Sequence, residues 1–326
     1  MSMEALGEFE RIRRFFAPLA GPGGLGLVDD AGLIDCAAGR RLVITADAIV
    51  AGVHYLPDDP PDLVARKLLR VNLSDLAAMG ARPLHYVLTT ALPAGLGPEW
   101  LARFADGLAE DQARFGIDLL GGDSVGTHGS AVLSLTAIGE VAAGQEIRRS
   151  GAELGDLVWV SGTIGDAALG LDLLRGSHPD LPPQDRDYLV RRFRVPDPRT
   201  ELGPRLIGVA RAMIDVSDGL LADLGHICET SQAAAVIEVG QLPLSSAARR
   251  IVERDPNLLP RLAAAGDDYE LLFAAPAGAT AAITALSSLL DLPVTRIGRI
   301  EEGTGARLVD DGGRPIPLQA TGYRHF

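Results

Sequence analysis

The stretch Val71-Asn-Leu-Ser-Asp-Leu-Ala-Ala-Met-Gly-Ala81 completes an apolar pattern of helical period that covers residues 62–79. On a helix, Asp75 shares a face with Val71, four positions before it, and with Leu68, three positions before Val71. A carboxylate on an apolar face needs a partner, and a bound metal ion is one. Alternatively, the helix breaks near Asn72, and Ser74 or Asp75 caps a second helix. The spacing alone favours neither alternative.

Outward from this helix, strand and helix patterns alternate in both halves of the chain, with strands expected at 41–47 and 117–120 among others. A length of 326 residues suits two typical domains. The polar, glycine-containing stretch from Gly144 to Asp156 is the natural boundary between them. We therefore expect an α/β (α+β) fold with two domains, 1–145 and 146–326.

The composition excludes several classes of function. The formal net charge is −13 and the basic residues form no cluster, which argues against nucleic acid as a partner. An acidic protein that handles phosphates has to neutralise them with bound cations, and Mg²⁺ is the obvious candidate. Lys67 is the only lysine, which argues against Schiff-base chemistry and against a phosphate-binding loop of the GxxxxGK[ST] type.

The sequence also indicates a location. Cys36 and Cys228 lie far apart and neither belongs to a CxxC pair, which argues against a disulfide framework or a zinc site. The N-terminus lacks the basic and apolar segments of a signal peptide, and no apolar run reaches the ~18 residues of a membrane-spanning helix. We therefore expect a cytoplasmic protein with no membrane partner.

Aspartates recur where a strand is expected to end or a helix to begin. Carboxylate oxygens suit hard cations such as Mg²⁺, whose other ligands are often waters and phosphate oxygens. A turn or a helix cap explains any single one of these aspartates better, but it explains the whole set less well. The set is Asp29, Asp30, Asp47, Asp75, Asp123, Asp215, Asp218, Asp267 and Asp268.

Two motifs with glycine carry some of these aspartates. Gly121-Gly-Asp123 follows an apolar strand, where two glycines let a nucleotide approach the backbone or simply form a tight turn. Asp215-Val-Ser-Asp-Gly219 lies between a strand and a helix, where Ser217 and Asp218 can cap the helix but Asp215 is left unexplained. In contrast, Gly21-x-Gly-x-x-Gly26 follows no strand and opens no helix, so we reject it as a dinucleotide fingerprint.

Two further residues have open interpretations. His54 lies in a glycine-containing loop just after Asp47, and a role in substrate binding is about as plausible there as a structural one. Arg148 and Arg149 lie at the domain boundary, where an arginine can bind phosphate through its forked guanidinium or can simply face solvent. No Ser-His-Asp or Cys-His arrangement can be assigned, so we expect no catalytic side-chain nucleophile.

Several of these motifs, in this order, resemble the thiamine-monophosphate kinase family. The resemblance runs nearly from end to end of the chain, and residues 72–80 are its most specific part. The stretches that carry it are Gly7-Glu-Phe9, Val50-Ala-Gly-Val-His54, residues 71–81, Gly121-Gly-Asp123, Arg149-Ser-Gly-Ala152, residues 215–219 and Gly266-Asp-Asp-Tyr-Glu-Leu-Leu272.

The resemblance implies a two-domain fold of the superfamily that includes aminoimidazole ribonucleotide synthetase and selenophosphate synthetase. The N-terminal domain would bind metal ions and ATP and would form a homodimer through its sheet, and the C-terminal domain would complete the active-site cleft. The implied reaction is the transfer of a phosphoryl group from ATP to thiamine monophosphate, which gives thiamine diphosphate.

The resemblance also implies a role for individual residues. The implied Mg²⁺ ligands are Asp30, Thr45, Ala46, Asp47, Asp75, Asp123, Asp215 and Asp218. The implied ATP contacts are Gly122, Asp123, Arg149 and Ser217, and the implied substrate contacts are His54, Asp267 and Tyr323.

The chain departs from the family pattern at three positions. Val28 stands where the family usually has a glycine, which alters the loop that carries Asp30. Ala46 stands where a hydroxyl residue is common, so only its carbonyl oxygen could bind a metal ion. Asp267 replaces a usual glutamate, which shortens the reach towards the substrate.

The implied reaction needs no general base. The attacking group would be a phosphate oxygen, which is mostly anionic at pH 7 because its second pKa is ~6. Several Mg²⁺ ions would screen the repulsion between the two anions and align an in-line transfer without a phosphoenzyme. Two alternatives stay open: another ATP-using enzyme of the same superfamily, and a non-catalytic nucleotide- or metal-binding module.

Overall fold

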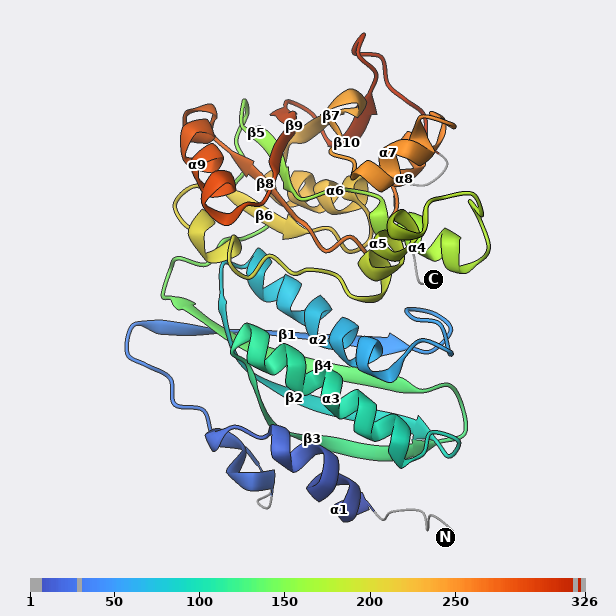
Figure 1. Cartoon of the computed structure of the whole chain (residues 1–326). Helices are drawn as coiled ribbons and strands as arrows, with labels where there is room; N and C mark the ends of the chain where they lie inside the picture. Colours follow the sequence, from blue (N-terminus) through green and yellow to red (C-terminus); the bar gives the residue numbers. More distant parts are fainter. Residues whose placement is uncertain (1–7, 28–30, 319–321, 324–326) are drawn as a thin grey trace. The chain divides into compact units, whose positions relative to one another are not determined.

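The computed structural model describes residues 8–27, 31–318 and 322–323. The chain divides into two compact units (Figure 1): unit 1 comprises Met1–Leu76 and Ala81–Gly144, and unit 2 comprises Ala77–Gly80 and Gln145–Phe326. The segment Ala77–Gly80 belongs to unit 2 although its neighbours on both sides belong to unit 1, and no sequence pattern indicated this.

Unit 1 begins with short helical segments and continues with long strands and helices. The short segments are α1 (Glu8–Arg11), a π-helix (Ile12–Phe16) and two 3₁₀ segments (Ala17–Leu19 and Pro22–Leu27). The main elements are β1 (Arg40–Val50), α2 (Pro61–Ala78), β2 (Arg82–Pro93), α3 (Pro98–Phe115), β3 (Asp118–Thr127) and β4 (Val132–Ala142).

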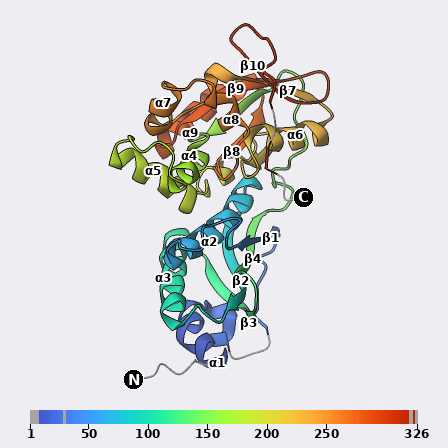
Figure 2. The ribbon, with the colours of Figure 1, turned by 90° about the vertical axis from the view of Figure 1, so that its right-hand side faces the viewer.

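The strands of unit 1 form one sheet in the order β1-β4-β2-β3. β4 pairs antiparallel with both β1 and β2, whereas β2 and β3 are parallel and are connected through α3. Helices α2 and α3 cover the same face of this sheet, and Figure 2 shows no described element of unit 1 on the opposite face. The sheet therefore has one covered face and one open face.

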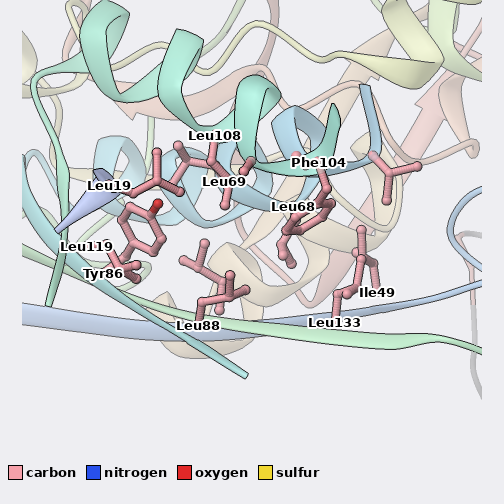
Figure 3. Packing of buried hydrophobic residues seen from close by; sticks show 14 of the residues in the cluster. Leu19, Ile49, Leu68, Leu69, Tyr86, Leu88, Phe104, Leu108, Leu119 and Leu133 are labelled. Carbon is pink, nitrogen blue, oxygen red and sulfur yellow. The ribbon is translucent and has the colours of Figure 1, made fainter. Parts of the chain in front are cut away.

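The core of unit 1 lies between these helices and the covered face (Figure 3). In β1 the buried residue on this face is Ile49, and side chains alternate between the two faces of a strand. Thr45 and Asp47 therefore point to the same side as Ile49, towards the helices. Other buried members of the core are Leu68 and Leu69 of α2, Phe104 and Leu108 of α3, and Tyr86, Leu88, Leu119 and Leu133 of the sheet.

A buried ion pair joins α2 to α3. The side chains of Arg70 and Asp111 are both fully buried, and Arg70 donates from Nε to Asp111 Oδ2 at 2.6 Å and from Nη2 to Oδ1 at 2.8 Å. Arg66 lies 3.3 Å from the same carboxylate. Burying two charges costs the free energy of their hydration, and a bidentate ion pair of this kind offsets that cost. The pair therefore holds α2 firmly just before Asp75.

Three elements of unit 1 continue without a break or an end that the sequence pattern allowed. Helix α2 is unbroken at Asn72, so the alternative of a break there is wrong. Strand β1 continues to Val50, so Asp47 lies inside a strand rather than at its end. Strand β3 continues through residues 121–123, so the glycine pair is not a turn. The strands continue because pairing with a neighbouring strand satisfies the backbone whatever the side chain is.

Unit 2 contains shorter elements. Its strands are β5 (Leu157–Ser161), β6 (Ala212–Asp215), β7 (Ala234–Glu238), β8 (Leu271–Ala275), β9 (Val294–Glu301) and β10 (Gly305–Val309). Its α-helices are α4 (Asp166–Leu174), α5 (Pro183–Arg194), α6 (Leu220–Ser231), α7 (Ser246–Val252), α8 (Leu258–Ala263) and α9 (Thr280–Leu290). In the described part of the chain, no helix has both the length and the apolar character needed to cross a membrane.

The sheet of unit 2 has the order β10-β7-β9-β5-β8-β6 and is covered on both faces. Val158 and Val160 of β5 belong to a core cluster that includes α6. Trp159, which points the other way, belongs to a cluster that includes Ile283 of α9. Burial on both faces explains why β8 is apolar at every position.

Candidate active site

One group of predicted site residues lies in unit 1, where β1 faces α2. The hydroxyl of Thr45 donates to Oδ2 of Asp75 at 2.6 Å, and Asp47 shares the side of β1 that carries Thr45. Asp75 therefore lies on the inner side of an unbroken helix. The alternative that Ser74 or Asp75 caps a second helix is wrong.

Asn72 is a member of this group that sequence reasoning considered only as a helix break. Its side chain is fully buried; Oδ1 accepts a hydrogen bond from the backbone N–H of Asp47 at 3.0 Å, and Nδ2 donates to the Leu68 carbonyl at 2.9 Å. Asn72 therefore ties β1 to α2 and sets the position of Asp47. The sequence did contain a signal for this role, which was an amide side chain inside an apolar helical pattern. A buried amide needs hydrogen-bond partners, so such a residue is expected to contact a neighbouring element.

The oxygens of Thr45, Asp47 and Asp75 fit Mg²⁺. This ion usually binds one or two carboxylates and completes its shell with waters and substrate phosphates. In the described residues, no three or more His, Cys, Asp or Glu side chains group closely enough to hold a metal ion by themselves. Asp30 lies outside the described residues, and Ala46 is exposed on the open face, so only its carbonyl is a candidate ligand.

Asp123 and Gly122 lie at the other edge of the same sheet. Asp47 is aligned with Leu135 of β4, which is aligned with Leu88 of β2, which is aligned with Gly122 of β3. Three strand spacings of about 4.8 Å separate the two ends of this row by about 14 Å. The oxygens that bind one Mg²⁺ are each about 2.1 Å from the ion, so a backbone separation of this size is too large for one ion even with the reach of both side chains. Asp47 and Asp123 of one chain would therefore bind different ions.

Gly122 has no room for a side chain. A Cβ atom at this position would lie 1.8 Å from the Leu88 carbonyl oxygen, so even alanine would push β3 away from β2. The glycine therefore permits close strand pairing, and its exposed backbone remains accessible.

His54 has a structural role that the sequence left open. Its ring Nδ1 accepts a hydrogen bond from the Val50 backbone N–H at 3.0 Å, and its carbonyl accepts one from the buried Lys67 at 2.8 Å. These contacts hold the turn after β1 and assign the ring proton of a neutral His54 to Nε2. A substrate contact of the ring would use Nε2.

A second group of predicted site residues lies in unit 2, where β6 leads into α6. Asp215 is buried at the end of β6, and Ser217 and Asp218 follow in a loop. Their side chains do not cap α6, because the cap residue is Gly219 and no side-chain cap is present. The capping interpretation is therefore wrong.

The carboxylate of Asp223 replaces such a cap. Its Oδ2 accepts hydrogen bonds from the backbone N–H groups of Ser217, Asp218 and Gly219, at 3.1, 3.2 and 3.0 Å. Burial raises the pKa of Asp223 to about 7, although these N–H groups act in the opposite direction. Sequence reasoning missed Asp223, which lies in the first turn of α6 and is 2% exposed.

Asp267 and Tyr323 lie beside the same loop. The backbone N–H of Asp267 donates to the Ser217 carbonyl at 2.8 Å, and that of Tyr323 donates to the Asp218 carbonyl at 2.9 Å. Asp267 adopts a φ of 69°, a strained conformation for a residue with a side chain. The structure therefore brings together four predicted residues from three segments that are far apart in sequence.

Asp268 has a structural role instead. It is fully buried, and it accepts hydrogen bonds from the backbone N–H groups of Gly165 and Ala167 at the start of α4, at 2.6 and 3.2 Å. Burial raises its pKa to about 8, partly offset by these N–H groups and by Arg192. Asp268 therefore caps the start of α4. A turn or a helix cap is the interpretation that the sequence alone favoured for any single aspartate.

Glu270, the next acidic residue in this stretch, is also fully buried. Its carboxylate accepts hydrogen bonds from Ser161 at 2.6 Å, Arg192 at 2.9 Å and Arg199 Nε at 2.5 Å. Asp267 and Tyr269, which alternate with Asp268 and Glu270, both have positive φ values, and the Tyr269 hydroxyl donates to Asp267 Oδ1 at 3.4 Å. The motif at 266–272 therefore combines two anchors with one predicted substrate residue.

Arg149 is exposed in a segment that runs beside β6. The carbonyl of the preceding residue, Arg148, accepts a hydrogen bond from the Met213 N–H at 2.9 Å. Gly151 adopts a φ of 115°, where a Cβ would lie 2.9 Å from the Arg211 carbonyl oxygen. The segment is thus held by its backbone while the Arg149 side chain stays exposed.

Comparison with known proteins places this arrangement in a family. Residues 28–141 match the family described as AIR synthase related protein, N-terminal domain. The thiamine-monophosphate kinase of Caulobacter vibrioides is 41% identical over 323 residues, which cover 98% of this chain and 90% of that protein. The chain belongs to the thiamine-monophosphate kinase family.

Two solved structures extend this comparison. The thiamine-monophosphate kinase of Stenotrophomonas maltophilia matches with a TM-score of 0.81 at 44% identity, over 86% of this chain and 89% of that one. AaThiL complexed with AMPPCP and TMP matches with a TM-score of 0.79 at 29% identity, over the whole of both chains. The family resemblance and the mixed α/β fold expected from the sequence are confirmed.

Membership of this kinase family leaves the roles of individual residues as predictions. Unit 1 brings together Thr45, Asp47 and Asp75 but keeps Asp123 and Gly122 at the far edge of the sheet. Unit 2 brings together Ser217, Asp218, Asp267 and Tyr323, with Asp215 two residues before Ser217.

Proposed function

We propose that the chain transfers the γ-phosphoryl group of ATP to thiamine monophosphate and so forms thiamine diphosphate, the last step in the biosynthesis of that cofactor. The observation that carries this proposal is the match to a thiamine-monophosphate kinase over 98% of the chain. AaThiL, which matches over the whole chain, was solved with AMPPCP, an analogue of ATP, and with TMP. The match includes both units and therefore all the residues proposed below.

The acceptor supplies its own nucleophile. The phosphate of thiamine monophosphate is mostly ionised at pH 7, since its second pKa is ~6. The chain has to bind two anions, align them and exclude water, but it does not have to remove a proton. We therefore propose direct in-line transfer without a catalytic side-chain nucleophile. The use of His54 Nδ1 in a backbone turn agrees with this proposal.

Bound Mg²⁺ would neutralise the phosphates and screen their mutual repulsion. Thr45, Asp47 and Asp75 would hold an ion on the helix side of β1, because the Thr45 and Asp75 oxygens meet there and Asp47 lies on the same side of the strand. Asp123 would hold a different ion, because it lies at the opposite edge of the sheet. Further ligands proposed by similarity are Asp30, the Ala46 carbonyl, Asp215 and Asp218.

The two substrates would use different residues. Gly122 and Asp123 of unit 1 and Arg149 and Ser217 of unit 2 would bind ATP; the exposed Arg149 guanidinium suits a phosphate. His54, Asp267 and Tyr323 would bind thiamine monophosphate. Tyr323 is 52% exposed, so its ring is available to a ligand.

We also propose that the chain forms a homodimer through the open face of the unit 1 sheet. Ile44 on this face is 65% exposed, and its neighbours on the same side of β1, Ala46 and Ala48, are exposed as well. An apolar sheet face normally needs a covering layer, and a second copy of the sheet would provide one. We propose a cytoplasmic location, where ATP is available.

The decisive test is an ATP-dependent assay of thiamine diphosphate formation from thiamine monophosphate with and without Mg²⁺. ATP binding without turnover would favour a non-catalytic module, and turnover only on another acceptor would favour a different enzyme of the superfamily. Free thiamine should be a poor acceptor, because its hydroxyl would need a base. Tyr323→Ala should raise the KM for thiamine monophosphate more than the KM for ATP; the reverse result would contradict the division of the site.

A further inference from the structure

The loop at residues 217–219 makes hydrogen bonds to Asp223 on one side and to the proposed substrate residues on the other. On its N–H side, three consecutive backbone groups donate to one oxygen of Asp223. On its carbonyl side, the Ser217 and Asp218 oxygens accept hydrogen bonds from the backbones of Asp267 and Tyr323. Since the same peptide units carry both sets of bonds, a shift on one side moves the other.

The segments around this loop are packed backbone to backbone. A Cβ atom on Gly266 would lie 2.2 Å from the Ser217 carbonyl oxygen, and one on Gly322 would lie 3.0 Å from the Asp218 carbonyl oxygen. Gly219 adopts a φ of 132°, where a Cβ would lie 2.6 Å from the Ala264 carbonyl oxygen. Direct packing of this kind transmits displacements, because no flexible side chain lies between the segments.

Asp223 itself is 2% exposed, and its bonded oxygen is occupied by the three N–H groups. An ordinary helix cap accepts from N–H groups inside the first turn of its helix. Asp223 instead accepts from three residues that precede α6. Its bonds therefore shape the loop more than they stabilise the helix.

We propose that Asp223 is a positioning residue for the reaction: through the 217–219 loop it sets the positions of Asp267 and Tyr323. The proposal rests on the proposed function, which assigns these two residues to thiamine monophosphate. Asp223 does not touch the substrate. Its removal would leave three N–H groups without this acceptor and would let both substrate residues move.

The test compares Asp223→Ala, which removes the acceptor, with Asp223→Asn, which keeps an oxygen in its place. Kinetics are measured at a temperature at which circular dichroism shows each variant to be folded. We expect Asp223→Ala to raise the KM for thiamine monophosphate at least tenfold, and by a larger factor than kcat falls. Asp223→Asn should restore the KM to within threefold of the wild-type value. A smaller folded fraction alone would lower kcat and leave KM unchanged.

Asp156 offers a matched control. It is 2% exposed, and it accepts hydrogen bonds from the Glu153 N–H at 2.9 Å and from Arg211 at 2.8 Å, outside the proposed site. Asp156→Ala should lower stability and leave the KM within twofold of the wild-type value. A wild-type KM in folded Asp223→Ala, or an equal rise in Asp156→Ala, would overturn the proposal. If Asp223→Ala does not fold, Asp223→Ser takes its place, since its hydroxyl is too short to reach all three N–H groups.

Amide hydrogen exchange tests the coupling without any substrate. In the folded Asp223 variant that lacks the acceptor, the amides of residues 217–219 and of Asp267 and Tyr323 should exchange faster together, while those of α6 beyond Leu224 keep their protection. Unchanged protection at Asp267 and Tyr323 would overturn the proposal. If the wild-type protein formed no thiamine diphosphate, the proposed function would fail, and the exchange experiment would still decide whether Asp223 positions these residues.

Discussion

Replacing Asp111 by alanine should destabilise unit 1 strongly. Arg70 and Asp111 are both fully buried, so the substitution leaves the Arg70 guanidinium in the core without this carboxylate. Breaking a buried pair in this way costs about 3–5 kcal/mol. A typical domain is stable by about 5–15 kcal/mol, so the loss would be at least about a fifth of the free energy of unfolding.

The chain provides a reporter for each unit. Its two tryptophans are Trp100, which stacks on Phe104 in unit 1 with ring centroids 5.1 Å apart, and Trp159 in unit 2. In a Trp159→Phe background, the fluorescence of Trp100 therefore follows unit 1 alone. With a urea dependence of about 2 kcal/mol per M, Asp111→Ala should lower the unfolding midpoint by roughly 1.5–2.5 M. Protein concentration is kept constant, because dimerisation would contribute to stability.

A double substitution separates charge from packing. Arg70→Met with Asp111→Leu removes both charges and fills the space with apolar groups, so it should recover most of the lost stability. A loss below about 1 kcal/mol in Asp111→Ala would refute the reasoning about the buried pair. A double variant as unstable as the single one would show that the loss comes from packing rather than from the lost ion pair of Arg70.

Three further predictions concern the metal site, pH and assembly. Asp75→Asn should abolish turnover and preserve the fold, because it removes charge from a site that binds cations. The control Asp106→Asn, on the exposed side of α3, should behave as wild type. Turnover by Asp75→Asn at ordinary Mg²⁺ levels would contradict the assignment of Asp75 as a metal ligand. Burial raises the pKa of Asp268 from 3.8 to about 8, so the folded state holds a proton that the unfolded state releases, and the free energy of unfolding should fall as pH rises across that range. Urea titrations at pH 5 and 9 measure this change, and it should be smaller in Asp268→Asn than in the wild type. An equal change in the free energy of unfolding in both proteins would contradict the raised pKa of Asp268. Ile44→Glu should produce monomers in sedimentation experiments. The control Leu289→Glu, at a 71% exposed position of unit 2, should remain dimeric. A dimeric Ile44→Glu would exclude the open sheet face as the interface.

Local sequence supplied the family and the candidate residues. The helical spacing gave the inner face of α2 as one of two possible positions for Asp75, and the order of the motifs indicated the family, which the comparisons confirm. Such inferences succeed because they depend on the period of one element or on a short run of residue types. The strand ends were predicted less well: β1 and β3 extend through Asp47 and Asp123 because their neighbours in the sheet continue to pair.

Other features were decided by tertiary structure. Asn72 and Asp223 have the ordinary appearance of polar residues in helices, and their roles depend on β1 and on the 217–219 loop lying within hydrogen-bonding distance. Adjacent aspartates diverge as well: Asp267 faces the loop and Asp268 caps a helix about one hundred positions earlier in the chain. The chain by itself determined the family, the alternation of elements and the residue types available for metal and phosphate. Only the folded chain decided which carboxylates bind backbone and which remain for ligands, because a buried carboxylate takes whatever donors the tertiary structure brings to it.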